Sequence, residues 1–248
     1  MTIGSDWPDS ASRPESTPRP ADRCCHTCRF YTAWESVGVT GVEVVPLLLP
    51  GRERRILDDP YTDVHEAAEG LVPQVFDLLP DGGPVAVFGH CLGALVAHEL
   101  TRRLLAADGP RVTRLFVSGT PVVPNTPPDR RATGIEDDVL FLERVKDFAG
   151  YRHEAFEEPE MRELLMPSLR ADVRMHETYR RQDGKPLRVP ITALRGRHDA
   201  LASLDDIRGW REVTDGDFET VELPGEHMYL AESPRLLLEL IAARCAAV

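Results

Sequence analysis

Residues 84–105 read PVAVFGHCLGALVAHELTRRLL, and this stretch decides the fold. It opens with the apolar run Val85–Phe88, which is typical of a buried parallel strand. After Gly89–Gly93, apolar residues recur at helical spacing as far as Leu105. A strand, a Gly-x-Cys-x-Gly turn and a helix together predict a nucleophile elbow with Cys91 at its apex. We expect the turn to need both of its glycines, because a Cβ at either position would clash.

The predicted elbow gives Cys91 a reactive setting. It places the thiol at the N-terminus of a helix, where unpaired N–H groups and a partial positive charge face it. A thiolate is stabilised in that position, so we expect a nucleophilic sulfur. The simpler alternative is a small buried cysteine in a glycine-rich turn. The flanking strand and helix favour the nucleophile.

Composition limits the classes of function. The chain has 248 residues, 42% of them hydrophobic, which is enough for one α/β domain with a substantial core. Its net charge of −12 argues against nucleic acid or an anionic membrane as the main partner. No apolar run could span a bilayer and no signal-peptide core precedes the domain, so we expect a cytoplasmic protein. Five cysteines, a low and odd number, fit a reducing compartment.

The N-terminal region differs from the rest of the chain. Residues 1–22 are rich in Pro, Ser and Asp, so we expect a disordered tail before a domain at residues 23–248. The segment Cys24–Cys28 holds one C-x-x-C and a histidine but no second pair at zinc-finger spacing. We therefore expect no metal site, no redox dithiol and no bound cofactor.

Strands and helices alternate through most of the domain. This alternation predicts a mostly parallel sheet with helices on both faces. It is interrupted at about residues 121–182 by a loop with four prolines and two helical segments. We interpret this insertion as a helical lid, and further helical cover of the core is the alternative. The predicted strands are 42–49, 85–88, 112–117, 188–194 and 218–223, and the predicted helices include 63–79, 136–148, 159–181, 203–210 and 233–245.

Two polar residues follow predicted strands on the edge that carries Cys91. Asp199 comes after strand 188–194, and His227 comes after strand 218–223. The order nucleophile, acid, base is that of α/β-hydrolases. In this arrangement His227 takes the thiol proton or already holds it, and Asp199 orients the imidazole.

Other residues could occupy these roles. His227 could be a histidine on a surface loop, and Asp205 or Asp206 could replace Asp199. We expect His198 to point away from the site because it is adjacent to Asp199. His90, inside the elbow, is expected to support the turn and not to transfer protons.

Several motifs resemble the type II thioesterases of nonribosomal peptide and polyketide biosynthesis. The resemblance extends from about Phe30 to the C-terminus and implies an α/β-hydrolase fold with a helical lid. It also implies a thioester substrate on the phosphopantetheine of an acyl- or peptidyl-carrier protein, and clearance of misprimed or stalled acyl groups. The Leu92 N–H would then be one oxyanion donor. We expect a monomer. The motifs are LPGRE at 49–53, GHCLGA at 89–94, LRAD at 169–172, ETY at 177–179 and GEHMYL at 225–230.

The nucleophile departs from that family, which usually has Ser where this chain has Cys91. A Cys enzyme forms a thioester, close in energy to the substrate thioester, so transfer to a second carrier thiol is nearly balanced. Hydrolysis is the leading hypothesis, and a Cys-dependent acyl or aminoacyl transferase between carriers is the alternative. A third possibility is a catalytically impaired relic that binds a carrier or a synthetase.

A second departure lies upstream. The family has a strand and a Pro-x-Ala-Gly-Gly-Ser loop before the segment that resembles residues 29–34, but residues 23–28 stand in their place. That loop normally supplies the second oxyanion N–H, and losing one such donor costs about 10²- to 10³-fold in rate. Either activity is impaired, or another N–H substitutes, or the sequence of residues 1–29 is not as written.

Overall fold

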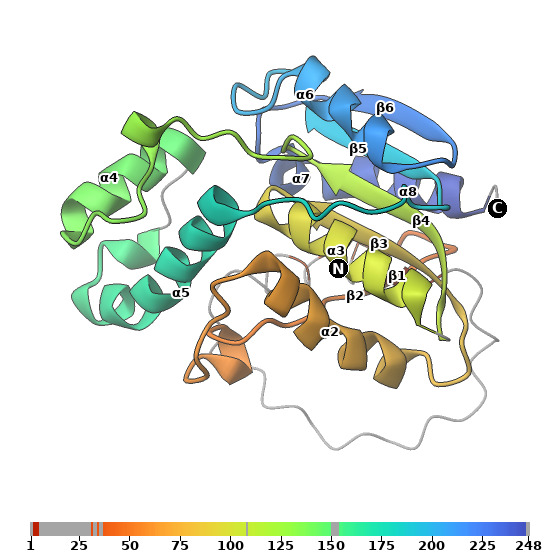
Figure 1. Cartoon of the computed structure of the whole chain (residues 1–248), viewed down its shortest axis with the longest axis horizontal. Coiled ribbons are helices and arrows are strands. Elements are labelled where there is room, and N and C mark those ends of the chain that lie inside the picture. The colour runs from red at the N-terminus through yellow and green to blue at the C-terminus, as the bar shows by residue number, and fades with distance from the viewer. Residues whose placement is uncertain are drawn as a thin grey trace.

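A computed structural model of the chain describes residues 2–4, 31, 34, 37–107, 109–149 and 154–246. Its centre is a six-stranded sheet with the order β2-β1-β3-β4-β5-β6, flanked by helices on both faces (Figure 1). Strands β3 to β6 are parallel, which confirms the predicted α/β architecture. The strands are β1 (Thr2–Gly4), β2 (Glu43–Val45), β3 (Pro84–His90), β4 (Arg111–Ser118), β5 (Ile191–Gly196) and β6 (Phe218–Leu223).

Most helices begin where the sequence predicts. The Asp63 side chain caps α2 by accepting the N–H groups of His65 and Glu66. Ser203 and Asp206 form a capping box on α6, which is shorter than predicted and continues as the 3-10 helix η4 (Gly209–Val213). The α-helices are α2 (Val64–Leu78), α3 (Leu92–Ala106), α4 (Asp138–Ala149), α5 (Pro159–Thr178), α6 (Leu204–Arg208), α7 (Tyr229–Glu232) and α8 (Pro234–Cys245).

Strand β3 is buried on both faces and separates two apolar cores. Val85 and Val87 belong to the core beneath α2 and α3, whereas Ala86 and Phe88 belong to the core beneath α7 and α8. This alternation follows from the two-residue period of a strand. A strand covered on both sides reads as a continuous apolar run, which is why it was predictable.

The region around β1 and β2 differs from the prediction. Thr2–Gly4 form β1, which pairs antiparallel with both β2 and β3, although residues 1–22 were expected to be disordered. Residues 5–22 lie outside the described part of the chain, as do Cys24, Cys25 and Cys28. Strand β2 ends at Val45, well short of the predicted 42–49. Beyond it, the Gln74 side chain bonds both the N–H and the C=O of Leu48 at 3.1 and 2.9 Å, in place of a strand partner.

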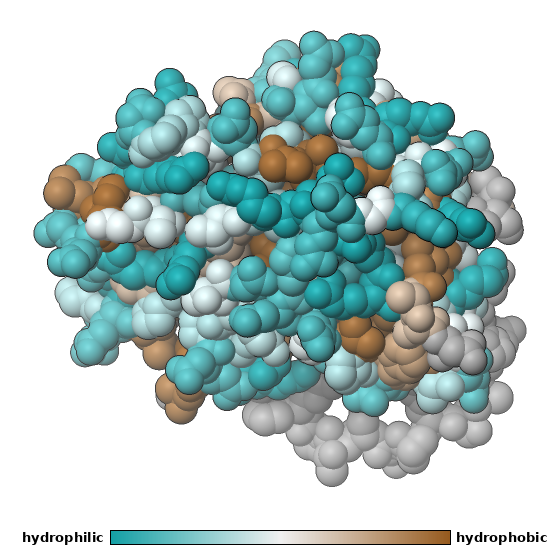
Figure 2. Space-filling view, viewed as in Figure 1, coloured by the Kyte–Doolittle hydropathy of each residue, from teal (hydrophilic) through white to brown (hydrophobic). Residues whose placement is uncertain are grey.

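Between β4 and β5 the chain leaves the sheet to form α4 and α5, at one side of the molecule (Figure 1). These helices enclose a small apolar cluster that includes Phe141, Met166 and Val173. Pro167 lies inside α5, where it cannot donate a helical hydrogen bond. The surface in Figure 2 is mostly hydrophilic, with apolar side chains at the edge over α4, and Val139 and Leu140 of α4 are 55% and 57% exposed.

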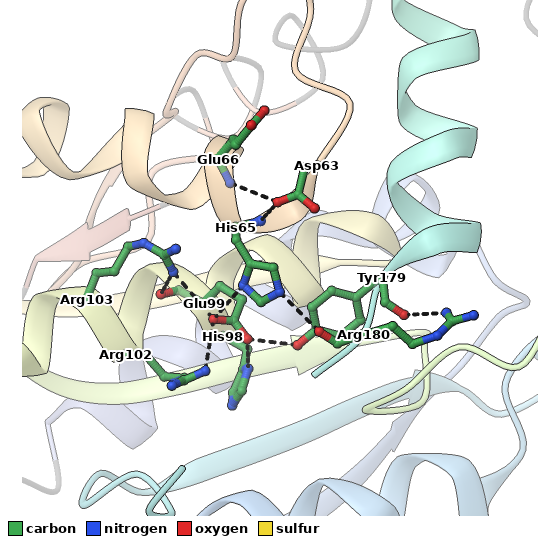
Figure 3. A network of polar contacts seen from close by, with 9 residues as sticks. All are labelled: Asp63, His65, Glu66, His98, Glu99, Arg102, Arg103, Tyr179 and Arg180. Atoms are coloured by element: carbon green, nitrogen blue, oxygen red, sulfur yellow. Dashed lines mark hydrogen bonds and ion pairs between the residues drawn. The ribbon is translucent and has the colours of Figure 1, made fainter. Parts of the chain in front are cut away.

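A polar network ties the C-terminal end of α5 to α2 and α3 (Figure 3). Its centre is Glu99 of α3, a fully buried carboxylate. The Tyr179 hydroxyl donates to Glu99 Oε1 at 2.9 Å, and Arg102 Nη1 donates to Oε2 at 3.2 Å. Burial raises the pKa of Glu99, but His98, Tyr179 and Arg102 outweigh it and bring this pKa down to about 2. His65 Nδ1 of α2 lies 3.2 Å from Glu99 Oε2, so three segments converge on one carboxylate. The same ring bonds the C=O of Arg180 at 3.0 Å.

We expect Glu99→Gln to lower the free energy of unfolding at pH 7 by about 2 kcal/mol, since it removes charge-assisted hydrogen bonds. A carboxylate with a lowered folded-state pKa stabilises the fold above its unfolded pKa, near 4.5, and loses that effect as pH falls through about 2. The difference between wild type and variant should therefore shrink between pH 4.5 and 2. Urea unfolding at several pH values measures it. A difference that stays constant over this range would show that the Glu99 charge is not responsible.

Candidate active site

Cys91 occupies the predicted elbow between β3 and α3. Its backbone has φ 51° and ψ −124°, a strained conformation for a residue with a side chain. The Cys91 N–H donates to the C=O of Ser118 at 2.8 Å, which holds the turn against β4. A Cβ on Gly89 would lie 2.0 Å from the C=O oxygen of Gly93, so position 89 must be glycine. The expectation that Gly93 is equally constrained is wrong, because a Cβ there would meet nothing within 4 Å.

The structure brings Asp199 and His227 together beside Cys91. Asp199 Oδ2 bonds His227 Nδ1 at 2.9 Å, and Asp199 Oδ1 accepts the N–H groups of Leu201 and Ala202 at 2.8 and 3.2 Å. Burial raises the pKa of Asp199, but these hydrogen bonds outweigh it, so the carboxyl is ionised at neutral pH. Burial lowers the pKa of His227, but hydrogen bonds to Asp199 and Cys91 outweigh this effect and raise the pKa to about 9. The three groups are thus in hydrogen-bond contact in the order of a triad.

The loops that carry the acid and the base are fitted to each other. A Cβ on Gly196, at the end of β5, would lie 2.0 Å from the C=O oxygen of Glu226. The His198 N–H donates to the C=O of Gly225 at 2.9 Å. Arg195 Nη2 donates to the C=O of Asp199 at 2.8 Å. Main-chain contact between the loops therefore fixes Asp199 relative to the loop of His227.

The alternative residues have other environments. His198 is exposed, whereas its neighbour Asp199 is buried. The Asp205 side chain is 89% exposed and pairs with Arg208, while Asp206 accepts from the N–H and hydroxyl of Ser203. Neither carboxylate replaces Asp199 as the partner of His227.

A second polar chain behind the triad was not predicted. His90 Nδ1 bonds Ser118 Oγ at 2.9 Å, and Ser118 Oγ bonds the Tyr229 hydroxyl at 2.8 Å. The His90 ring lies 4.6 Å from the ring of His227, centroid to centroid. Burial, then the charge on His227, lower the pKa of His90 to about 3 against a smaller opposing effect of Asp199, so His90 is neutral. A neutral ring that packs on His227 agrees with the supporting role expected for His90. Ser118 directly follows the predicted strand 112–117, but this position gave no signal of its two partners.

Gly119, the next residue, gives a direct test of this packing. A Cβ there would lie 2.6 Å from His90 Cε1 and 3.0 Å from His227 Cε1. We expect Gly119→Ala to displace these rings and lower kcat for thioester hydrolysis about 10²-fold, as small misplacements in active sites do. Gly82→Ala is the matched control, because Gly82 has φ +73°, close to +68° at Gly119, but lies in the turn before β3. Equal losses of activity in both variants would contradict the prediction.

A main-chain donor directly follows Cys91. Leu92 is the first residue of α3, so its N–H has no partner within the helix. The strand position beside β3 holds β1, whose Thr2 pairs with Val87 and whose Ile3 pairs with Ala86. β1 is antiparallel to β3, so its described residues run away from the end of β3 that carries Cys91.

Two cavities meet at Cys91. The first, about 340 Å³, is largely apolar and lies between α3 and α5, with Leu49, Leu92, Val96, Leu169 and Val173 in its walls. Arg52 and Asp172, from two of the motifs noted in the sequence, form an ion pair in the same wall. The second, about 710 Å³, is more polar and is lined by Thr120, Asn125, Arg130, Asp147 and His227. Of all described residues, Cys91 and His176 alone line both cavities.

The described residues include two free thiols and no candidate metal site. No group of three or more His, Cys, Asp or Glu side chains in this part of the chain could hold a metal ion. Cys91 and Cys245 are both free thiols, and burial raises the pKa of Cys245 to about 11. Within the same residues, no helix is both long enough and apolar enough to cross a membrane.

Comparison with known proteins places the chain in a family. The thioesterase domain family matches residues 27–245. Linear gramicidin dehydrogenase LgrE of Brevibacillus parabrevis is 33% identical over 219 residues, which cover 86% of this chain and 81% of LgrE. Thioesterase PikA5 of Streptomyces venezuelae is 32% identical over 223 residues, or 90% of this chain and 77% of PikA5.

A solved structure agrees with these matches. The type II thioesterase BorB from the borrelidin biosynthetic cluster is 33% identical, with a TM-score of 0.66 over 82% of this chain and 80% of BorB. LgrE carries a dehydrogenase name, whereas the matching family, PikA5 and BorB are all thioesterases. The chain therefore belongs to the thioesterase family and is a hydrolase that acts on thioester bonds.

Proposed function

We propose that the protein releases acyl or aminoacyl groups from the phosphopantetheine thioester of carrier proteins in nonribosomal peptide or polyketide biosynthesis. The observation that carries this proposal is the Cys91–His227–Asp199 array at the meeting point of two cavities. Support for the pathway comes from the relatives, since BorB belongs to the borrelidin biosynthetic cluster and GrsT, 30% identical, is a gramicidin S biosynthesis protein. The partner is then an acyl- or peptidyl-carrier protein.

In the proposed first half-reaction, Cys91 Sγ attacks the thioester carbonyl carbon. His227 holds the thiol proton, which fits its raised pKa of about 9, and Asp199 stabilises the resulting imidazolium. The carbonyl electron pair moves onto oxygen, where the Leu92 N–H is a donor. The pair returns as the carbon–sulfur bond to phosphopantetheine breaks, and His227 gives its proton to the departing thiolate. The product is an acyl-Cys91 thioester and a free carrier thiol.

In the second half-reaction, His227 removes a proton from water, which attacks the acyl-Cys91 carbonyl. The bond to Sγ breaks, the free acid leaves, and the proton returns to Cys91. The apolar cavity suits the acyl chain, and the polar cavity suits the amide-rich phosphopantetheine arm. In this arrangement the two parts of the substrate lie on opposite sides of the reacting carbon.

The cysteine itself favours a second candidate function. An acyl-Cys is a thioester like the substrate, so a second carrier thiol could accept the acyl group at nearly no cost in free energy. A transferase would use the same first half-reaction, with a carrier thiol in place of water.

Intact-protein mass spectrometry distinguishes these functions. The protein is mixed with acyl-loaded carrier, with and without a second carrier that bears empty phosphopantetheine. An adduct on Cys91 that decays to free acid in both mixtures supports the thioesterase. An adduct that persists until the second carrier arrives, and then loads it, supports the transferase and contradicts hydrolysis. Absence of any adduct and of free acid, with carrier still bound, would instead indicate a binding protein.

A further inference from the structure

Ser118, at the end of β4, connects the nucleophile elbow to the segment that carries the base. Its C=O accepts the Cys91 N–H at 2.8 Å, and its Oγ bonds His90 Nδ1 at 2.9 Å. The same Oγ bonds the Tyr229 hydroxyl at 2.8 Å. Tyr229 follows His227 by two positions and begins the short helix α7. Two bonds of Ser118 thus hold the elbow, and a third holds the segment of His227.

The hydroxyl groups of this chain have a preferred direction of donation. Ser118 and Tyr229 are fully buried, and burial holds the pKa of the Tyr229 phenol well above its usual range, so the phenol keeps its hydrogen. When Tyr229 donates to Ser118 Oγ, the Ser118 hydroxyl is free to donate to Nδ1 of the neutral His90 ring. Both buried hydroxyl hydrogens then have an acceptor among the described residues. The opposite direction leaves the phenol hydrogen without one, which is costly in a buried site.

Other contacts of the base segment fix a different distance. Main-chain contacts between the loops of residues 196–198 and 225–226 hold His227 against Asp199. They set the position of the base relative to the acid. The separation of His227 from Cys91 depends instead on how this segment lies against β4 and the elbow, and the hydroxyl chain makes that contact.

The space around His227 leaves little room for a displaced ring. The centroids of the His90 and His227 rings are 4.6 Å apart. A Cβ at position 119, directly after Ser118, would lie 2.6 Å from one ring and 3.0 Å from the other. The far end of the hydroxyl chain, at His90, is therefore also in contact with the base. The titratable groups that act on the charge of His227, or feel it, are Asp199, Cys91, His90 and His176.

We propose that Tyr229 is a positioning residue, which holds His227 at bonding distance from Cys91 by donating its hydroxyl hydrogen to Ser118. Tyr229 lines neither of the two cavities at Cys91, so it acts through the base and not on the substrate. The inference rests on the proposed function, because it concerns the proton that Cys91 and His227 exchange. It predicts that loss of the hydroxyl lowers kcat and leaves KM unchanged.

Tyr229→Phe is the direct test, since it removes the hydroxyl and keeps the buried ring. We expect kcat for the butyryl thioester of N-acetylcysteamine to fall about 10-fold or more, with KM within about twofold of wild type. The pKa of His227, about 9 in the wild type, should fall, because the hydrogen bond to Cys91 and the charge of Cys91 contribute to it. Chromatography of the released thiol and NMR titration of the His227 Cε1–H resonance measure these values in the full chain.

A second variant and a matched control complete the test. Ser118→Ala removes the acceptor of the same bond and should lower kcat at least as much as Tyr229→Phe. The double variant should lose no more than Ser118→Ala alone, because residues that act as one unit are not additive. Thr113→Val is the control, since Thr113 lies five positions earlier on β4 and its buried hydroxyl donates to the C=O of Val85 at 3.2 Å. It should leave kcat and the pKa of His227 unchanged.

Each other outcome has a definite meaning. The inference is overturned if kcat of Tyr229→Phe stays within about twofold of wild type, or falls while the pKa of His227 is unchanged. An equal loss of kcat in Thr113→Val, or losses that multiply in the double variant, also overturn it. A wild-type protein that releases no thiol from this substrate or from acyl-loaded carrier overturns the proposed function. The pKa of His227 in wild type and Tyr229→Phe would then still decide whether the hydroxyl positions the base.

Discussion

Cys91→Ala should abolish thioester hydrolysis and the acyl adduct together. Replacing the nucleophile of a hydrolase triad lowers kcat by about 10⁶-fold, and background attack by water sets the residual rate. The fold should survive, because Cys91 is only partly buried and its N–H still bonds the C=O of Ser118. Alanine at this position keeps the same strained φ of 51°, so the free energy of unfolding should change little.

Cys245→Ala is the matched control for this variant. Cys245 is the other thiol in the described part of the chain, and it is buried in the core beneath α8. Its removal should leave kcat unchanged and eliminate no adduct. If Cys91→Ala retained more than about 1% of wild-type kcat, the nucleophile would have to be another group, and the assignment of Cys91 would be wrong.

Asp199→Asn should lower kcat about 10⁴-fold without loss of the fold. The asparagine amide is nearly the same size as the carboxylate, but it can hold His227 in the wrong tautomer and no longer stabilises the imidazolium. The pKa of His227, about 9 in the wild type, should fall because its largest favourable contribution comes from the hydrogen bond with Asp199. NMR titration of the His227 Cε1–H resonance measures this directly.

The same prediction has a consequence for stability. A histidine with a raised folded-state pKa stabilises the fold below its unfolded pKa of 6.5, and that effect is lost as pH rises through about 9. The variant should therefore lose stability relative to wild type below pH 6.5 and approach it above pH 9. Asp206→Asn, in the α6 capping box, is the control that removes a nearby carboxylate from outside the triad. If Asp206→Asn lost as much kcat as Asp199→Asn, Asp206 would have to be the acid of the triad.

The elbow was predictable because its signals are local. Strand, turn and helix fall within residues 84–105, and the order of Asp199 and His227 follows from the ends of two clear strands. Position 89 must be glycine because it lies close to the backbone of Gly93, and the Gly-x-Cys-x-Gly pattern indicates this requirement. The equal constraint assumed for Gly93 was wrong because its Cβ position faces open space.

The parts that could not be predicted depend on distant partners. Ser118 meets a histidine 28 positions earlier and a tyrosine 111 positions later, and no pattern in the sequence records such contacts. Glu99 has arginines three and four positions later, the spacing of an exposed helical ion pair, yet it is fully buried. Thr2–Gly4 carry too little hydrophobic pattern to predict a strand.

The position of Pro167 has a consequence for motion. Asp172, Glu177 and Tyr179, whose polar contacts tie α5 to Arg52, to Ala132 and to α3, all follow this proline. Because a helix bends most easily where a backbone hydrogen bond is missing, the part before Pro167 should bend away while the turn with His176 stays in place. In amide hydrogen exchange, residues 159–166 should then exchange faster than residues 171–178. Motion that opens the cavities would in that case leave the geometry of the reacting centre unchanged.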